Sequence, residues 1–233
     1  MNVYISIDGV LRDTIGKFEY HYNDYFFESD TEVDESFDYK ISDPIFNDDL
    51  TEYFKFQSTD EFNHFTYIEF PLEIFGHAFT SYNNVFLDLN KFIHENKDNK
   101  ITLVGLNEKG RAKPATLFFL SKNNFLGDNV KFITSDDIKK EWKKCDVWIT
   151  DSEEILKTKP KGKKVIMFRT KYNEHIYPHH TKYRIKELKE IEKICLTFSE
   201  KITISIWTRL QSLVKPNQKT KTIKSKTKKT TTK

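Results

Sequence analysis

Short apolar runs rich in β-branched residues alternate with amphipathic segments along most of the chain. The first run, residues 2–7 (NVYISI), ends at a turn formed by Asp8 and Gly9 and predicts a buried strand. Apolar residues then recur at helical spacing, which predicts a helix over residues 14–27. By the same two patterns, further strands are expected at residues 100–106, 130–134, 146–151 and 163–168, and further helices at residues 82–99, 114–125, 135–145, 182–198 and 204–214.

Strands that alternate with helices are typical of βαβ units, which build a parallel sheet with helices on both faces. The expected fold class is therefore α/β, with three layers. In the expected helix over residues 182–198, the apolar positions Ile185, Leu188, Ile191 and Cys195 should face inward.

Residues 28–73 interrupt this alternation. Acidic residues are interleaved there with aromatic ones (ESDTEVDESFDYKISDPIF), and the pattern predicts no particular regular structure. We expect an insertion that lies outside the sheet, and contact with a partner is one way to order it. The expected organisation is a core of residues 1–27 and 74–214, an insertion of residues 28–73 and a tail of residues 215–233.

Composition is compatible with one folded body. Hydrophobic residues make up 37% of the 233 residues and aromatic residues 15%, which is enough to bury a core. No apolar run of membrane-spanning length and no signal-like start is present, so we expect a soluble, intracellular protein without a membrane partner. The two cysteines, Cys145 and Cys195, lack a CxxC spacing and are expected to be reduced, partly buried thiols.

Charge separates the tail from the body. Residues 215–233 carry eight lysines and no acid, so the net charge of +3 leaves about −5 on the rest of the chain. The tail has almost nothing to bury and is expected to be disordered. It can attract nucleic-acid phosphates without reading bases, dock on an acidic protein face or aid solubility. The lysines expected to make such contacts are Lys219, Lys221, Lys224, Lys226, Lys228 and Lys229.

The opening segment carries the motif DGVLRD, which is followed by a helix. Taken together, this segment and the later strand ends resemble the haloacid dehalogenase superfamily. Within that superfamily the 5′(3′)-deoxyribonucleotidase-like proteins, including phage-encoded ones, are the most similar branch. The resemblance covers most of residues 2–194 and is weak over residues 28–73, where the family carries a variable cap. It implies a Rossmann-like three-layer fold with a cap-like insertion.

The family's chemistry depends on a few strand-end residues. An aspartate takes up the phosphoryl group, a second aspartate acts as general acid and base, a serine or threonine binds the phosphate, a lysine offsets charge and paired acids hold magnesium. The resemblance places these roles, in order, at Ser6, Asp8, Gly105, Lys140, Thr150 and Asp151.

Three of these positions depart from the family pattern. Ser6 and Thr150 replace carboxylates that magnesium would need, and Gly105 lacks the phosphate-binding hydroxyl. A serine hydroxyl is also a weak nucleophile unless a base activates it. We therefore expect no catalytic residue and no cofactor, with Asp8 and Asp151 as weak candidates for a metal site. Both have a structural reading as well, since Asp8 can cap its turn and Asp151 can precede a short helix.

Other candidate chemistry is less specific. His175, His179 and His180 lie close in sequence, but no pattern of cysteines or carboxylates completes a zinc site. The basic, glycine-containing loops at residues 107–114 and 157–164 follow strands and could contact a phosphate, but neither has the spacing of a P-loop.

Three functions remain open at this stage. The leading hypothesis is a catalytically silent protein that serves as a structural or assembly component, such as a neck or tail ring subunit of a phage virion, with other proteins of the assembly or further copies of itself as its partners. In it, the insertion's aromatic residues would supply a contact surface and its acids would steer a basic partner. The alternatives are a divergent magnesium-dependent nucleotidase using Ser6, Asp8, Lys140 and Asp151, and a nucleotide or nucleic-acid binder without enzymatic activity. The expected location is the host cytoplasm or the virion.

Overall fold

A six-stranded parallel sheet forms the centre of the protein. The computed structural model describes residues 1–28, 34, 36–41, 49–175 and 183–191, all within one compact unit, Met1–Glu192. Every pairing in the sheet is parallel and the strand order is β5-β4-β1-β6-β7-β8. The strands are β1 (Asn2–Ser6), β4 (Lys100–Leu106), β5 (Val130–Ile133), β6 (Val147–Thr150), β7 (Lys164–Phe168) and β8 (Tyr183–Ile185). The expected α/β class is confirmed, and strands β1, β4, β5, β6 and β7 lie where strands were expected.

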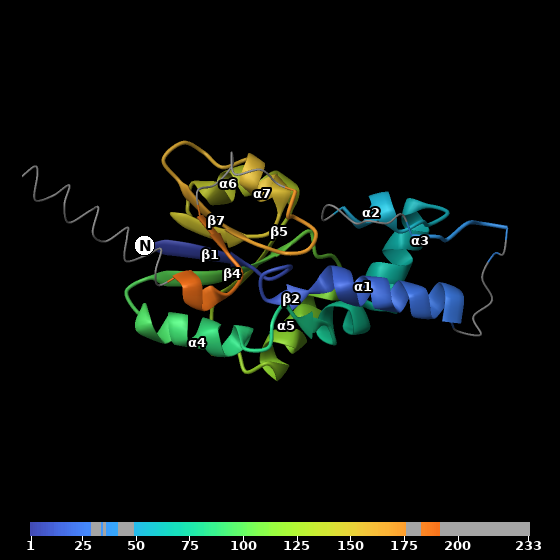
Figure 1. Cartoon of the computed structure of the whole chain (residues 1–233), viewed down its shortest axis with the longest axis horizontal. Helices are drawn as coiled ribbons and strands as arrows, with labels where there is room; N and C mark the ends of the chain where they lie inside the picture. Colours follow the sequence, from blue (N-terminus) through green and yellow to red (C-terminus); the bar gives the residue numbers. More distant parts are fainter. Residues whose placement is uncertain (29–33, 35, 42–48, 176–182, 192–233) are drawn as a thin grey trace, which may run out of the picture. The chain divides into compact units, whose positions relative to one another are not determined.

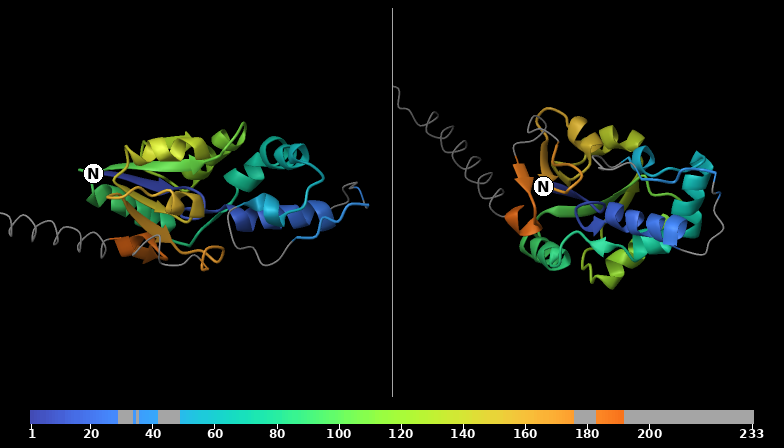
Figure 2. Two further views of the ribbon diagram at one scale, coloured as in Figure 1. Left: turned by 90° about the horizontal axis from the view of Figure 1, so that it is seen from above. Right: turned by 45° about the vertical axis from the view of Figure 1, so that its right-hand side comes forward.

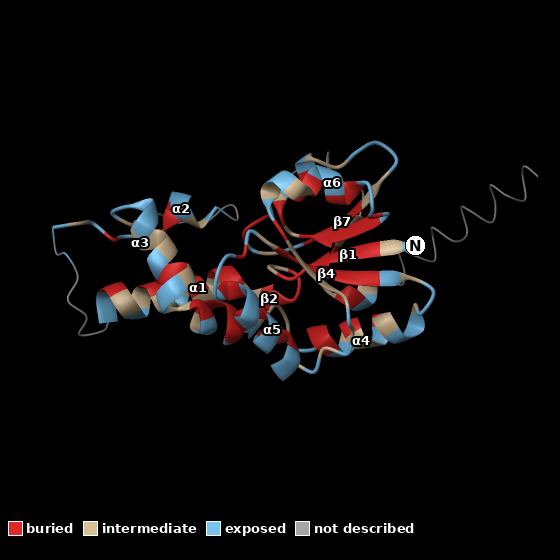
Figure 3. Cartoon of the chain, turned by 180° about the vertical axis from the view of Figure 1, so that it is seen from behind, coloured by how far each residue is buried: buried red, intermediate tan, exposed pale blue. Residues whose placement is uncertain are grey.

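Helices cover both faces of the sheet. Figure 1 shows α6 (Ile138–Trp142) and α7 (Glu153–Lys157) on one side, and α4 (Val85–Glu95) and α5 (Ala112–Lys122) on the other. Strands β1, β4, β6 and β7 between them are almost entirely buried (Figure 3), whereas β5 and β8 at the two edges are partly exposed. Under α6 the rings of Trp142 and Trp148 pack with centroids 5.0 Å apart. The three-layer arrangement is the one that the alternating pattern predicts.

The end of the described chain differs from the expectation. Residues 182–198 were expected to form one helix, but Tyr183–Ile185 forms strand β8 on the open edge of β7, followed by a 3-10 turn at Leu188–Glu190. The edge of β7 offers backbone hydrogen bonds that the local periodicity cannot reveal. Ile185, Leu188 and Ile191 are buried as expected. Cys195, the expected helix at residues 204–214 and the lysine tail lie outside the described residues.

Residues after α1 (Thr14–Asn23) build a second, aromatic core beside the sheet. The helix continues as a π-helical turn at Asp24–Glu28 and packs against α2 (Leu50–Tyr53), α3 (Thr59–His64) and π-helical turns at Phe65–Glu69 and Leu72–Gly76. Phe18 lies at the centre of this core, 4.7 Å from the ring of Phe54 and 5.5 Å from that of Phe65. Both views in Figure 2 place these helices at the end of the sheet opposite Met1, where the parallel strands finish.

The aromatic residues of the insertion are therefore largely internal. Tyr39, Tyr53, Phe54 and Phe65 are all buried. For these residues the expectation of an aromatic contact surface is wrong, because their rings pack against α1 and one another. None of the helices that the structure describes is long and apolar enough to cross a membrane.

Candidate functional site

A cavity of about 520 Å³ lies at the carboxyl ends of the central strands. One side is formed by residues that end or follow β1, β4, β6 and β7, and the other by residues of the insertion. Open parallel sheets hold ligands at this edge. The lining includes Ser6, Asp8, Asn107, Asp151, Ser152, Phe168 and Thr170 from the sheet side and Asp49, Leu50, Phe62, Thr66 and Tyr67 from the insertion.

Two neutral hydroxyl groups join the ends of β1 and β6. Ser6 Oγ donates a hydrogen bond to Thr150 Oγ1 over 2.8 Å. Trp148 Nε1 donates to Ser6 Oγ over 3.3 Å, and the backbone N–H of Ser152 donates to Thr150 Oγ1 over 3.1 Å. Ser6 and Thr150 are buried, with 5% and 0% exposure. Ser6 thus gives its proton to a threonine rather than to a base, which leaves it without the activation that a serine nucleophile needs.

Asp8 reaches the cavity wall but is tied into its own turn. Its Oδ1 atom accepts hydrogen bonds from Arg12 Nη2 at 2.7 Å, from Arg12 Nε at 3.2 Å and from the Thr14 hydroxyl. The side chain of Asp8 is 32% exposed. Three donors on one carboxylate oxygen hold Asp8 in place, as the structural reading of this residue expects.

Arg12 links Asp8 to a second, fully buried carboxylate. Arg12 is 0% exposed and its Nη2 atom also donates to Glu108 Oε1 over 2.9 Å. Its Nη1 atom donates to the carbonyl oxygen of Phe75 and to the hydroxyl of Thr116. Burial disfavours the charged form of Arg12, but the two carboxylates outweigh that effect and raise its pKa. Arg12 therefore joins the β1 turn to the loop after β4 and to α5.

Glu108 occupies the space in front of Gly105. A side chain built on Gly105 would meet Glu108 Oε1 at 2.8 Å and the ring of Phe132 at 2.7 Å. A serine or threonine at this position would therefore displace the buried carboxylate. The space where the resemblance implies a phosphate-binding hydroxyl is instead occupied by the carboxyl group of Glu108. No motif in the sequence marks Glu108, whereas Arg12 lies within DGVLRD.

Asp151 lies directly against the turn after β1. Gly9 has a φ of +68°, and a Cβ atom there would lie 1.7 Å from Asp151 Oδ2. The loop that carries Asp151 is fixed by Asn173, whose Nδ2 donates to the carbonyl oxygens of Asp151 at 3.1 Å and Phe168 at 2.8 Å. Asp151 also precedes the short helix α7, as expected, although Ser152 is the N-cap residue.

Of the six expected positions, three line the cavity: Ser6, Asp8 and Asp151. Gly105 and Thr150 are buried behind it. Lys140 is exposed on α6 and is not among the lining residues, so the spacing that selected it does not bring it into the cavity. Among the described residues, the cations that line the cavity are Arg169 and Lys171, which follow β7 and were not anticipated.

Several hydroxyl groups of the lining have no hydrogen-bond partner among the residues described. These atoms are Thr66 Oγ1 on the insertion side and Ser152 Oγ, Thr170 Oγ1 and Tyr172 Oη on the sheet side. Thr66, Ser152 and Tyr172 are each less than 10% exposed. Buried polar groups in native proteins are nearly always satisfied, so these groups call for a ligand or ordered water.

The donor set does not suit magnesium. Mg²⁺ prefers several oxygen ligands in a tight octahedron, with carboxylates among them. Ser6 and Thr150 are neutral and bonded to each other, and one oxygen of Asp8 already accepts three hydrogen bonds. Within residues 1–28, 34, 36–41, 49–175 and 183–191, no three His, Cys, Asp or Glu side chains are arranged to hold a metal ion.

Glu108 makes stability depend on pH in a defined window. Burial, only partly offset by Arg12, raises the pKa of Glu108 to about 7 from an ordinary value of 4.5. Above the ordinary value the unfolded chain releases this proton while the folded chain keeps it, so stability falls as pH rises towards 7. Glutamine does not ionise, so Glu108→Gln should avoid up to about 3 kcal/mol of this loss in the free energy of unfolding.

The check is urea unfolding of both proteins at pH 5 and pH 8. The difference between the variant and the natural chain should grow in the variant's favour at pH 8. A difference independent of pH would show that Glu108 is ionised in the folded protein across the range.

Most of the remaining candidates from the sequence lie away from the cavity or outside the residues that the structure describes. The loop at residues 157–164 packs near Met1 and Asp146, at the amino ends of the strands, so its expected place at the ligand edge is wrong. In the other basic loop, residues 107–114, Asn107 lines the cavity. Cys145 is a buried free thiol, and burial raises its pKa to about 12, which makes it unreactive. His179 and His180 lie outside the described residues.

No family model matches the chain, and the search of curated proteins finds no match either. The α/β fold and the geometry of the cavity therefore carry the functional argument.

Proposed function

We propose that this protein is a catalytically silent relative of the haloacid dehalogenase phosphatases, with residues 28–73 as its cap-like insertion, and that it acts as a structural or assembly component. The observation that carries the proposal is the buried hydrogen bond between Ser6 Oγ and Thr150 Oγ1. It stands where the resemblance implies a nucleophile beside a metal ligand.

The neighbouring residues support the loss of phosphoryl transfer. Such transfer is catalysed almost entirely by positioning and by stabilising charge on the phosphoryl oxygens. Glu108 occupies the space where the resemblance implies a phosphate-binding hydroxyl, and Lys140 is not among the described residues that line the cavity. Removing a single electrostatic element of an active site commonly costs ~10²–10³ in rate. The combined losses should remove turnover.

An exposed apolar surface supports a role in assembly. Tyr20, Phe79 and Phe118 are 57%, 56% and 42% exposed. The Lys17 ammonium lies 4.7 Å from the centroid of Tyr20 and 5.3 Å from that of Phe79. The ring of His77 packs 5.2 Å from Phe118. Tyrosine and phenylalanine are enriched in protein interfaces relative to the rest of the surface. This surface takes over the contact role first expected of the insertion's aromatic residues.

The location in a virion and contact of the tail lysines with nucleic acid remain part of this proposal, and the divergent nucleotidase is its main competitor. The experiment that separates them is a phosphatase assay of the full chain with Mg²⁺ and a panel of nucleoside monophosphates. The proposal predicts no turnover above that of the heat-denatured protein.

A second function, binding of a small molecule without catalysis, is favoured by one specific observation. The unpartnered hydroxyl groups belong to both sides of the cavity, Thr66 on the insertion and Ser152, Thr170 and Tyr172 on the sheet side. If the cavity had only lost its chemistry, unpartnered hydroxyl groups on both the insertion and the sheet side would have no role.

A further inference from the structure

The exposed aromatic surface carries two lysines and forms a basic aromatic patch. Helix α1, strand β3 (Phe79–Thr80) and helix α5 contribute its members, which are Lys17, Tyr20, Phe79, Phe118 and Lys122. Lys17 lies over the rings of Tyr20 and Phe79, and Lys122 Nζ lies 5.8 Å from the centroid of Phe118. Burial and the nearby charge of Lys17 lower the pKa of Lys122. The two lysines are therefore neighbours, and the patch is one continuous surface.

The positive charge of the patch has no carboxylate partner in the part of the chain that the structure describes. Lys17 and Lys122 contact aromatic rings instead. A polypeptide that brings carboxylates and an apolar side chain would therefore be stabilised on the patch. Single-stranded nucleic acid fits less well, because its bases stack on aromatic rings and these rings already hold ammonium groups. The net charge of about −5 on residues 1–214 also disfavours a long polyanion.

The π-helical turn after α1 and the segment beside it have the opposite chemistry. The ring of Tyr39 stacks on that of Phe26 with centroids 4.2 Å apart, which holds the neighbouring acids beside the turn. Hydrogen bonds from the hydroxyl and the backbone N–H of Ser36 lower the pKa of Asp34 and keep it ionised. Among the residues described, no lysine or arginine pairs with the carboxylates of this acidic end. Its members, all exposed, are Phe27, Glu28, Asp34 and Asp38.

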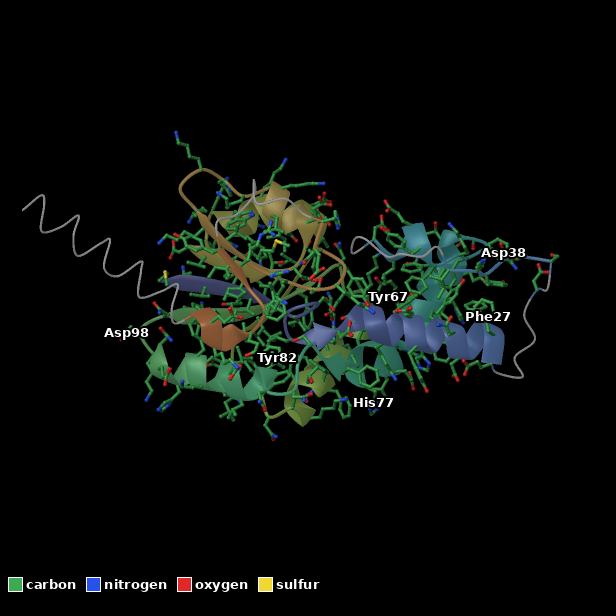
Figure 4. All side chains as sticks on the ribbon, viewed as in Figure 1. Phe27, Asp38, Tyr67, His77, Tyr82 and Asp98 are labelled. Atoms are coloured by element: carbon green, nitrogen blue, oxygen red, sulfur yellow. The ribbon has the colours of Figure 1, made fainter. Side chains whose placement is uncertain are left out.

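The acidic end and the basic aromatic patch lie at different places on one copy. Lys17 and Glu28 belong to the same helical segment, α1 and its π-helical turn, and are roughly 15 Å apart along its axis. Figure 4 shows Phe27 and Asp38 together at one end of the molecule, and His77, which borders the patch, apart from them. The helix holds the two surfaces apart, so they can pair only between two copies.

We propose that the basic aromatic patch binds the acidic end of a second copy of this chain, so that carboxylates face Lys17 and Lys122 and the Phe27 ring packs against the exposed aromatics. Each copy presents one patch and one acidic end, so the contact is head-to-tail and produces a ring or an open series of copies. The net charge of the whole chain is only +3, so general repulsion between copies is weak. The inference rests on the proposed assembly role and supplies its partner and its two surfaces.

The test is sedimentation velocity of the full chain at about 5–100 µM, a range in which weak interfaces form. Species larger than the monomer should increase with concentration at ~0.05 M salt and decrease at ~0.5 M salt. The patch variant Lys17→Glu, Lys122→Glu should weaken self-association more than tenfold, because it turns attraction into repulsion. The acid variant Glu28→Gln, Asp34→Asn, Asp38→Asn removes three charges and keeps the side-chain shapes, and should weaken it by about tenfold.

Two controls accompany these variants. Lys139→Glu, Lys143→Glu makes the same change of charge at exposed lysines on and next to α6, on the other face of the sheet from α5 (Figure 1), and should alter self-association less than twofold. Mixing the patch variant with the acid variant is the second control, because each keeps the surface that the other lacks. The mixture should form dimers that neither variant forms alone, which also shows that both variants are folded.

Three results would overturn this inference: no concentration-dependent species, equal weakening by the α6 control and the patch variant, or no dimers in the mixture. Self-association that is lost only on removal of residues 215–233 would contradict it as well, by making the lysine tail the occupant of the acidic end. So would binding of an oligothymidine strand that the patch variant abolishes, without self-association. The proposed function can fail separately, because the phosphatase assay does not depend on self-association and a monomer can still assemble with other proteins.

Discussion

Replacing Arg12 by methionine should lower the free energy of unfolding by about 3–5 kcal/mol, because it takes the counter-ion from the buried carboxylate of Glu108 and the half-buried carboxylate of Asp8. Arg12 has no exposed surface, and its guanidinium contacts Asp8, Glu108, the carbonyl oxygen of Phe75 and the Thr116 hydroxyl. Methionine fills a similar volume, so the loss reports on charge and hydrogen bonding rather than on a cavity. The measurement is urea unfolding followed by circular dichroism at pH 8, where Glu108 is ionised.

Arg169→Met provides the control for removal of an arginine. Arg169 is exposed and its ion pair with Glu174 spans 3.4 Å, so its loss should cost at most about 1 kcal/mol. If Arg12→Met cost no more than Arg169→Met, Arg12 would not be the connection between the β1 turn, the loop after β4 and α5.

Gly9→Ala is the second change with a large expected effect. The left-handed conformation of Gly9 alone costs a non-glycine residue about 1–2 kcal/mol. The added Cβ would also meet the Asp151 carboxylate at 1.7 Å, which forces Asp151 out of its position. The total destabilisation should reach about 2–4 kcal/mol, measured by the same urea unfolding.

Gly162→Ala separates the two causes. Gly162 has a φ of +87°, yet a Cβ there meets no atom within 4 Å, so this variant reports on backbone strain alone. Gly9→Ala should cost clearly more than Gly162→Ala. Equal costs would mean that Asp151 does not lie against the turn.

The fold was predictable from the sequence where the information was local. Strands β1, β4, β6 and β7 are apolar, β-branched runs that are buried on both faces, and this makes their pattern unambiguous, while the edge strand β5 has the same kind of sequence but is only half-buried. Strand β8 was missed because three of its residues pair with an edge that only the folded sheet creates. The acidic aromatic segment was also misjudged, because residue spacing does not show that Phe54 and Phe65 pack against Phe18 on α1.

The candidate site was likewise predictable from the sequence only in part. Strand-end residues Ser6, Asp8 and Asp151 could be brought together from sequence, because parallel strands place their carboxyl ends at one edge. Glu108 could not, since it reaches the site from a loop and is identified only by its contact with Arg12. Lys140 was selected by distance along the chain, which does not determine the direction of a side chain on a short helix.

The proposed loss of phosphatase chemistry is compatible with a cavity that remains formed. The Ser6 and Thr150 hydroxyls satisfy each other inside the sheet edge, so this pair needs no ligand to be stable. The hydroxyl groups of Thr66, Ser152, Thr170 and Tyr172, which line the cavity, have no such partner among the residues described. Selection for ligand binding would preserve these hydroxyl groups even where positions 6 and 150 no longer supported catalysis.

The most direct test of catalytic silence is the Mg²⁺-dependent release of phosphate by the unmodified full chain, measured beside the double variant Ser6→Asp, Thr150→Asp, which restores both carboxylates. The account predicts no release above the heat-denatured background for the unmodified chain, whether or not the double variant gains any activity. Release by the unmodified chain that depends on Mg²⁺ and disappears in Asp8→Asn would contradict it.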